Sequence, residues 1–187
     1  MTLPSASGTI RTFVALELPE AHREALAAHL ADCGRRAPGH RWVEPDSLHL
    51  TLRFLGNVEP DVLDLVRDRL AGVRGTPFRL AIGHRGVFGP RAAPRVVWIG
   101  VDEGLEDCVR LAAAVEAACR AAGLAPEERE FRAHVTLARA RSEGARIPAE
   151  LPAPPELPPW TARDFVLFES RLRQLPRYVP LDRYRLT

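Results

Sequence analysis

The tetrad His-x-Thr-Leu occurs twice in this chain, as "HLTL" at residues 49–52 and as "HVTL" at residues 134–137. With 8 Thr and 24 Leu among 187 residues, a given histidine has Thr two positions later and Leu three positions later by chance with a probability of ~0.005. The chain has six histidines, so two such coincidences are rarer still. The repeat therefore indicates a chemical role that the two tetrads share.

Imidazole and hydroxyl side chains together suit acid–base chemistry on a phosphodiester. A neutral imidazole is a general base, its cation is a general acid, and the ordinary histidine pKa lies close to working pH. Two imidazoles on opposite sides of a phosphorus atom can activate an attacking oxygen and protonate a leaving oxygen. Threonine hydroxyls can donate hydrogen bonds to the nonbridging oxygens and stabilise their developing charge. The candidate catalytic residues are His49, Thr51, His134 and Thr136.

Several other chemistries lack the residues that they need. All 26 basic residues are arginine, which excludes a Schiff-base lysine, a P-loop lysine and a lysine adenylate. The histidines lack the helical spacing of a zinc protease, no carboxylate cluster lies near the tetrads in sequence, and Gly-x-Ser-x-Gly is absent. We therefore expect no metal ion and no cofactor.

Without a Cys-x-x-Cys pair, Cys33, Cys108 and Cys119 are expected to be small buried helix residues.

Each tetrad is expected to lie in a β-strand. Side chains alternate between the faces of a strand, so His49 and Thr51 share one face while Leu50 and Leu52 share the other. The same alternation holds in the second tetrad. The apolar residues then anchor each strand in the core. If the two halves of the chain face each other, both imidazoles and both hydroxyls converge on one cleft.

The surrounding pattern predicts strands and three helices in alternation. Strands are expected within residues 11–19, 41–56, 78–84, 95–101, 130–140, 162–170 and 177–187. Helices are expected within residues 19–36, 61–73 and 103–123. His22 and His29 lie off the apolar stripe of the first helix, so we expect both to be solvated. The segment 144–160 holds six prolines and is expected to cross the surface irregularly.

This order predicts an α+β fold with mostly antiparallel sheets, and the similar make-up of the two halves suggests a pair of lobes that face each other. Residues 1–9 are expected to be a flexible tail, and residues 10–187 a single bilobal domain. No apolar run approaches the roughly 18 residues of a membrane span, and the N-terminus shows no secretory signal. We expect a cytoplasmic monomer that does not bind membranes.

The net charge of +2 and the isoelectric point near 8.7 are mildly basic. They are compatible with an anionic substrate but do not require one. The planar guanidinium of arginine suits bidentate contacts with phosphate, and arginine is the only basic residue type present besides histidine.

Four stretches of the chain together resemble one family. They are "RWVEPDSLHLTLRFLG", "RVVWIG", "FRAHVTLARA" and the C-terminal "FVLFESRL" with "YVPLDRYRL". From about Arg11 to Leu186, the chain resembles the RNA 2′,3′-cyclic phosphodiesterases, also called 2′-5′ RNA ligases, of the LigT-like branch of the two-histidine (2H) phosphoesterases. The resemblance implies a bilobal α+β fold in which two mostly antiparallel sheets face a central cleft, the helices lie on the outside and each lobe holds one tetrad.

The resemblance also implies a reaction and the roles of the residues. The family hydrolyses a terminal 2′,3′-cyclic phosphate to a 2′-phosphomonoester. By its pattern His134 is the proton acceptor that activates water, and His49 is the proton donor to the departing 3′-oxygen. Thr51 and Thr136 hold the phosphate, and Arg139 takes the position of an arginine after the second tetrad. The implied partner is RNA with a 2′,3′-cyclic phosphate end, tRNA fragments included, and the reverse reaction is ATP-independent 2′-5′ ligation.

Arg139 poses a geometric problem, because it lies five positions after His134. On an unbroken strand these two side chains face opposite ways, so Arg139 reaches the phosphate only if a bulge or the strand end intervenes. Otherwise it is a surface arginine. Phe54 and Trp98 could stack on a base, but aromatic residues in apolar strands are more commonly core residues, and we expect core packing for both.

Two further positions, Arg95 and Tyr178, are candidates for the rim of the cleft. Glu130 and Ala133 stand just before the second tetrad, where the family often has prolines, and the Glu130 carboxylate bears on the local loop and on the RNA preference. Two alternatives stay open: a phosphodiesterase for small cyclic nucleotides or ADP-ribose cyclic phosphate, and an RNA-end binding module without turnover.

Overall fold

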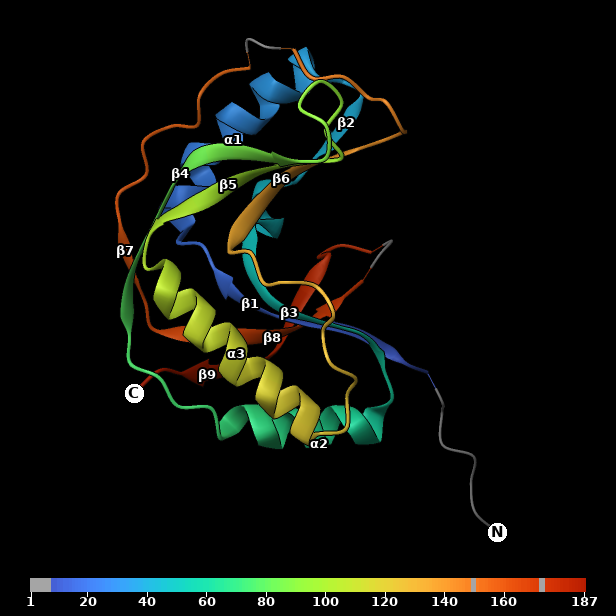
Figure 1. Cartoon of the computed structure of the whole chain (residues 1–187), viewed down its shortest axis with the longest axis vertical. Coiled ribbons are helices and arrows are strands. Elements are labelled where there is room, and N and C mark those ends of the chain that lie inside the picture. The colour runs from blue at the N-terminus through green and yellow to red at the C-terminus, as the bar shows by residue number, and fades with distance from the viewer. Residues whose placement is uncertain (1–7, 149–150, 172–173) are drawn as a thin grey trace.

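The computed structural model describes residues 8–148, 151–171 and 174–187 (Figure 1). The helices are α1 (Glu20–Arg36), α2 (Pro60–Ala71) and α3 (Leu105–Ala121), with a 3-10 turn at Pro45–Ser47. The strands are β1 (Ile10–Glu17), β2 (His40–Trp42), β3 (His49–Val58), β4 (Phe78–Phe88), β5 (Val96–Glu103), β6 (His134–Ala140), β7 (Trp160–Ala162), β8 (Asp164–Ser170) and β9 (Tyr178–Arg185). The three expected helices are confirmed. The short strands β2 and β7 were not expected, because three residues carry no readable alternation.

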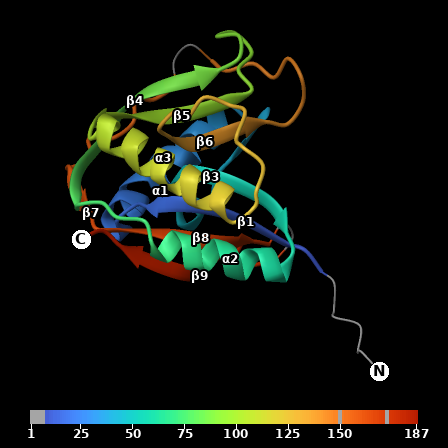
Figure 2. The same cartoon turned by 60° about the horizontal axis from the view of Figure 1, so that its bottom comes forward.

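In the described residues the strands form one curled sheet with the order β7-β4-β5-β6-β3-β1-β8-β9, and β2 pairs with the outer part of β6. Each pairing is antiparallel. Two strand groups make up the halves of the sheet: β3, β1, β8 and β9 on one side, and β6, β5, β4 and β7 on the other. Figures 1 and 2 show how the sheet curls so that these halves face each other. The expected α+β fold class is confirmed.

The two halves of the sheet join where β3 pairs with β6. The ladder between these strands consists of one residue pair, Leu50 opposite Val135. Both residues are buried, and each directly follows the histidine of its tetrad. The two tetrad strands are therefore neighbours at the seam of the sheet, so the fold itself brings residues from distant parts of the chain together.

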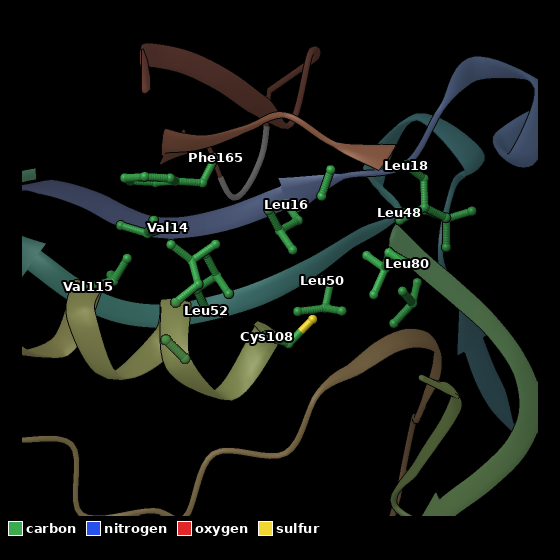
Figure 3. Close-up of a cluster of buried hydrophobic side chains, with 14 of the residues drawn as sticks. Val14, Leu16, Leu18, Leu48, Leu50, Leu52, Leu80, Cys108, Val115 and Phe165 are labelled. Atoms are coloured by element: carbon green, nitrogen blue, oxygen red, sulfur yellow. The ribbon is translucent and has the colours of Figure 1, made fainter. Parts of the chain in front are cut away.

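The main core lies between the sheet and the three helices, and it includes Leu26 and Leu30 of α1. Leu50 and Leu52 point from β3 toward Cys108 and Val115 of α3 (Figure 3). These side chains are at most 5% exposed, and burying large apolar side chains is the main source of folding free energy. The apolar positions of each tetrad thus anchor its strand, as the alternation predicts, and leave the histidine face toward the cleft. All three cysteines are buried and free, as expected.

The proline-rich segment covers one face of α1, which corrects the expectation for His22 and His29. His22 is buried and its Nε2 bonds the Pro158 carbonyl at 2.8 Å, with the Trp160 ring edge-on beside it. His29 is buried beside Cys33. A helix face that lies off the apolar stripe is solvated only if nothing else crosses it, and here an irregular segment does.

The division into a tail of residues 1–9 and a domain of residues 10–187 stays a prediction, and residues 1–7 lie outside the described residues. Among the described helices, none is both long and apolar enough to cross a membrane.

Candidate active site

The register at the seam arranges the two tetrads as a square of side chains. Because Leu50 lies opposite Val135 in an antiparallel pair, His49 is set beside Thr136, and Thr51 beside His134. All four side chains are half-buried, while the residues between them are fully buried. The alternation predicted for each tetrad is present, and each imidazole lies next to the hydroxyl of the other tetrad.

These four side chains line one cleft of about 460 Å³. Its wall also contains Phe13, Phe54 and Tyr178, and Ser47 and Ser170 lie at its edges. The structure thus brings together all five candidate site residues, since Arg139 lines the same cleft.

Both imidazoles are held in the same way. The Nδ1 atom of His49 lies 2.8 Å from the Ser47 carbonyl oxygen, and the Nδ1 atom of His134 lies 2.6 Å from the Arg132 carbonyl oxygen. A carbonyl oxygen only accepts, so in each ring Nδ1 carries the proton and donates it. When the ring is neutral, Nε2 is then the basic nitrogen. Each histidine bonds the residue two positions before it, which fixes the same tautomer in both tetrads.

Aromatic side chains pack against each imidazole. Phe13 lies 4.7 Å from the His49 ring, centroid to centroid, and Tyr178 stands edge-on to it at 5.1 Å. Phe88 stands edge-on to His134 at 5.0 Å, and Trp98 lies 6.2 Å away. These contacts leave little freedom to rotate, so they hold each Nε2 atom in position.

Burial lowers the pKa of both histidines. The pKa of His49 falls to about 4, first because of desolvation and then because of positive charge on neighbours, among them Arg139. The hydrogen bond to the Ser47 carbonyl opposes this shift. The pKa of His134 is lowered by the same causes, desolvation first and Arg139 also. Both imidazoles are therefore neutral at pH 7 while the cleft holds no anion.

A bulge in β6 solves the geometric problem of Arg139. Trp98 of β5 pairs with Thr136 and Val97 pairs with Ala138, so Leu137 is an extra residue on β6. An extra residue reverses the alternation beyond it. Leu137 and Ala138 are accordingly both buried, and Arg139 faces the cleft. A bulge between His134 and Arg139 is one of the two ways in which Arg139 could be expected to face the same side as His134.

The first tetrad has a matching bulge. Thr51 and Arg53 pair with the successive residues Ala15 and Val14 of β1, so Leu52 is the extra residue. Beyond it Phe54 faces the cleft and is 48% exposed, which makes the expectation of core packing wrong for Phe54. Phe54 stands five positions after His49, as Arg139 stands after His134.

The β3 bulge also buries Arg53 against the second half of the chain. Arg53 is 7% exposed, and its Nε lies 2.6 Å from Glu116 of α3. Its other nitrogens contact Glu127 at 3.1 Å and the Ala125 carbonyl at 2.5 Å. Glu127 precedes His134 in the segment 122–133, so Arg53 ties this segment and α3 to the strand of the first tetrad.

Arginines gather around the cleft more densely than the net charge suggests. Five line it: Arg11, Arg41, Arg129, Arg139 and Arg177. Arg41 of β2 lies directly opposite Arg139 of β6 in the strand register. Like charges in such a pair repel, and an anion bound between them removes the repulsion. Burial and the positive charges of Arg41 and Arg177 lower the pKa of Arg139.

The sequence pattern did not indicate four of these arginines as cleft residues: Arg11, Arg41, Arg129 and Arg177. Only the unexpected strand β2 could have indicated Arg41, and its three residues give no pattern. Arg177 lies over the Tyr178 ring, with 5.6 Å from its guanidinium carbon to the ring centroid. Tyr178 is at the cleft, as expected for a rim residue, whereas Arg95 lines neither this cleft nor the cavity beside it.

Trp98, Glu130 and Ala133 do not line the cleft. Trp98, expected to be a core residue, is half-buried rather than fully buried and contacts Phe88 and His134. Glu130 is exposed and pairs with Arg132 at 3.4 Å, and Ala133 packs against the core. Within residues 8–148, 151–171 and 174–187, no group of three or more His, Cys, Asp or Glu side chains is placed to hold a metal ion.

Comparison with known proteins agrees with this geometry. The family model described as LigT like Phosphoesterase matches residues 16–98 and again residues 99–178, so each match contains one tetrad. An RNA 2′,3′-cyclic phosphodiesterase of Escherichia coli is 32% identical over 182 residues, which cover 95% of this chain and 97% of that protein.

A second relative is longer than this chain. The RNA 2′,3′-cyclic phosphodiesterase of Geobacillus stearothermophilus is 30% identical over 182 residues, and the match covers 93% of this chain but 56% of the relative. The chain thus spans little more than half of that protein's length.

Among solved structures, Escherichia coli LigT complexed with 3′-AMP superposes with a TM-score of 0.82 and 28% identity, over 96% of this chain and 99% of that one. The two family matches together span most of the sequence and meet at residue 99, between the two tetrads. On this ground the chain belongs to the LigT-like phosphoesterase family.

Proposed function

We propose that this chain hydrolyses the terminal 2′,3′-cyclic phosphate of RNA to a 2′-phosphomonoester by two-histidine acid–base catalysis that needs no metal ion. The observation that carries this proposal is the seam register, which sets two imidazoles and two hydroxyls around one cleft. The relatives named RNA 2′,3′-cyclic phosphodiesterase support the substrate class.

The proposed mechanism uses both Nε2 atoms. His134 accepts a proton from water as the water oxygen attacks phosphorus, and His49 donates a proton to the 3′-oxygen as the bond between phosphorus and that oxygen breaks. Thr51 and Thr136 donate hydrogen bonds to the nonbridging oxygens, and Arg139 stabilises their charge. Each acid or base role contributes about 10²–10⁴-fold in rate.

Because the pKa of His49 is lowered in the free protein, protonation of His49 depends on the charge of the bound substrate. His49 must be protonated to act as the acid, yet its pKa is about 4 in the free protein. A phosphodiester anion next to the ring favours the imidazolium and raises this pKa. Binding of the anionic substrate therefore favours protonated His49, which is the form that acts as the acid. Binding of a neutral ligand does not.

The arginines around the cleft support RNA over a cyclic mononucleotide as substrate. A terminal cyclic phosphate carries one negative charge, whereas five arginines line the cleft. The additional arginines suit the phosphates of upstream nucleotides. With a 5′-hydroxyl in place of water as the nucleophile, the same geometry would form a bond from phosphorus to the 5′-oxygen as the bond to the 3′-oxygen breaks, which gives 2′-5′ ligation without ATP.

The test offers the purified protein an oligoribonucleotide with a 2′,3′-cyclic phosphate end, in excess EDTA, and determines the position of the product monoester by ³¹P NMR. We expect a 2′-phosphomonoester. His49→Ala and His134→Ala should each lower kcat about 10²–10⁴-fold. His84→Ala is the matched control, because His84 is exposed and lies outside the cleft.

A 3′-phosphate product, or full activity in either tetrad variant, would contradict the proposed roles. Loss of activity in EDTA that zinc or manganese restores would contradict the metal-free mechanism. The use of tRNA fragments, the monomeric state and the cytoplasmic location stay predictions.

A further inference from the structure

Tyr178 packs against the residue proposed as the acid. It is the first residue of β9, and β8 and β1 lie between β9 and the tetrad strand β3 in the sheet order. Its ring nevertheless stands edge-on to the His49 imidazole, with 5.1 Å between the ring centroids, and edge-on to Phe13 at 4.9 Å. The side chain therefore reaches across two strands to the cleft, which it lines.

An apolar cluster holds the Tyr178 ring. Tyr178 packs against four side chains that are at most 6% exposed and that form a cluster separate from the main core: Phe13, Ala15, Val166 and Phe168. Within it Phe13 stacks on Phe168, with 5.2 Å between the ring centroids. The ring of Tyr178 is thus fixed by apolar contacts, and the hydroxyl is the one polar group of this side chain.

The Tyr178 hydroxyl takes part in no hydrogen bond with another described residue. The chain has two tyrosines, and the hydroxyl of the other, Tyr184, is buried without a partner, whereas the hydroxyl of Tyr178 is not buried. A tyrosine hydroxyl can donate one hydrogen bond. At the cleft this donor is therefore available to a ligand.

The charges around Tyr178 are those of the proposed phosphate site. The guanidinium carbon of Arg177 lies 5.6 Å from the centroid of the Tyr178 ring. Burial lowers the pKa of Arg139, negative charge on the Tyr178 oxygen acts against this shift, and the charge of Arg177 adds to it. The carboxylate of Glu127, which also lines the cleft, is paired with Arg53. The hydroxyl thus lies among cationic groups that attract an anion.

We propose that the Tyr178 hydroxyl donates a hydrogen bond to a nonbridging oxygen of the scissile phosphate, and that this bond strengthens as negative charge develops there. This inference rests on the proposed function. The phenol keeps its proton throughout, so the proton transfers of His49 and His134 are unchanged. Tyr178 adds a hydroxyl donor from a third strand to those of Thr51 and Thr136.

The kinetic test removes the oxygen and keeps the ring. Tyr178→Phe retains the packing against His49, and Tyr184→Phe is the matched control, because it loses the same atom outside the cleft, where the Tyr184 ring stacks on Phe165 at 5.0 Å. The substrate is an oligoribonucleotide with a 2′,3′-cyclic phosphate end. We expect Tyr178→Phe to lower kcat about 10- to 100-fold with a smaller change in KM, because the lost bond is strongest in the transition state. Tyr184→Phe should keep kcat within about twofold of the wild type.

A second measurement tests the contact with phosphate in the wild-type protein. With ¹³C at the tyrosine Cζ atoms, the protein gives two NMR signals, which Tyr184→Phe assigns. We expect inorganic phosphate to shift the Tyr178 signal. Adenosine, which has no phosphate, should leave it unchanged, and neither ligand should shift the Tyr184 signal.

The proposal is overturned if kcat of Tyr178→Phe stays within about twofold of the wild type. It is also overturned if phosphate leaves the Tyr178 signal unshifted, or if adenosine shifts it and phosphate does not, because the hydroxyl would then act without contacting phosphate. Wild-type protein that shows the expected phosphate shift but does not hydrolyse the oligoribonucleotide would contradict the proposed function and would leave the hydrogen bond to phosphate supported.

Discussion

His49 and His134 are held by the same set of interactions although 85 residues separate them. Each donates Nδ1–H to the carbonyl two residues before it, and each packs against two aromatic rings. Desolvation lowers the pKa of both rings, and the charge of Arg139 lowers both further. The symmetry ends beyond the bulges, where one tetrad has Phe54 and the other Arg139. The aromatic ring of Phe54 suits stacking on a nucleobase, and the guanidinium of Arg139 suits contact with a phosphate.

The lowered pKa values predict the pH dependence of kcat/KM, which reports the free enzyme. Activity requires His49 protonated and His134 neutral. Protonated His49 is lost as pH rises above about 4, and neutral His134 is lost as pH falls below a pKa that is lower than 6.5. Both limbs of the kcat/KM profile should therefore lie below pH 6.5, and the limbs of kcat should lie at higher pH because bound phosphate raises both pKa values. Limbs of kcat/KM at or above pH 6.5 would contradict this.

Arg139→Gln should separate the two effects of the guanidinium. Loss of the charge-assisted contact should lower kcat/KM about 10- to 100-fold. Because Arg139 lowers the pKa of both histidines, its removal should also displace both limbs of the profile to higher pH. The measurement is the full pH profile of the variant. A lower kcat/KM with both limbs of the pH profile at their wild-type positions would show that Arg139 does not change the pKa of either histidine.

Two bulged strands and the segment 122–133 position these side chains. The alternation within each tetrad could be predicted from sequence, because period-two patterning is local. The bulges at Leu52 and Leu137 could not, since they arise from pairing with β1 and β5. The orientation of Arg139 and Phe54 therefore had to come from the structure. Arg41 was missed for a similar reason: β2 owes its place to pairing with β6.

The Arg53 contacts with Glu116 and Glu127 should matter for turnover as well as for stability. Arg53→Met releases the segment that leads to His134, so we expect kcat to fall about tenfold or more with a smaller change in KM. Arg67→Met is the control, because Arg67 pairs with Asp182 at 2.8 Å between α2 and β9, away from the cleft. Both variants should have a lower Tm, but only Arg53→Met should lose kcat.

Assays for this comparison run well below the lower of the two Tm values. If Arg53→Met does not fold, Glu127→Gln weakens the same contact at a more exposed residue and should give a smaller loss of kcat. Wild-type kcat in a folded Arg53→Met variant would show that the contact is structural only.

At the scale of the whole molecule, one curled sheet brings the two copies of the His-x-Thr-Leu tetrad together in a single cleft. The two family matches each cover one half, and the halves share one residue pair at the seam, Leu50 opposite Val135. The overall fold class could be predicted from the order of helices and strands. The concentration of arginines at the cleft could not be, because a net charge of +2 says nothing about where the charges lie.

This concentration of charge predicts a salt dependence that grows with substrate length. For a single strand, each phosphate contact contributes about −0.7 to the slope of log affinity against log salt. We expect the KM of an oligoribonucleotide with a cyclic phosphate end to rise more steeply with salt than that of a 2′,3′-cyclic mononucleotide.

Arg11→Gln tests the same prediction at one position. Arg11 pairs with Asn57, toward the end of β3 far from His49. The substitution should reduce the slope for the oligoribonucleotide by about 0.7 and leave the mononucleotide unchanged. Equal slopes for the two substrates would contradict an extended RNA contact.

The central claim is that both imidazoles act on one phosphate through Nε2, and ¹⁵N NMR of the histidine rings tests it most directly. The spectra of the free protein and of the protein saturated with a 2′-phosphomonoester oligoribonucleotide are compared over a pH titration. We predict that Nε2 of His49 and Nε2 of His134 both shift on binding, and that both pKa values rise from their lowered values. A response confined to one of the two rings, or unchanged pKa values in the saturated protein, would contradict the account.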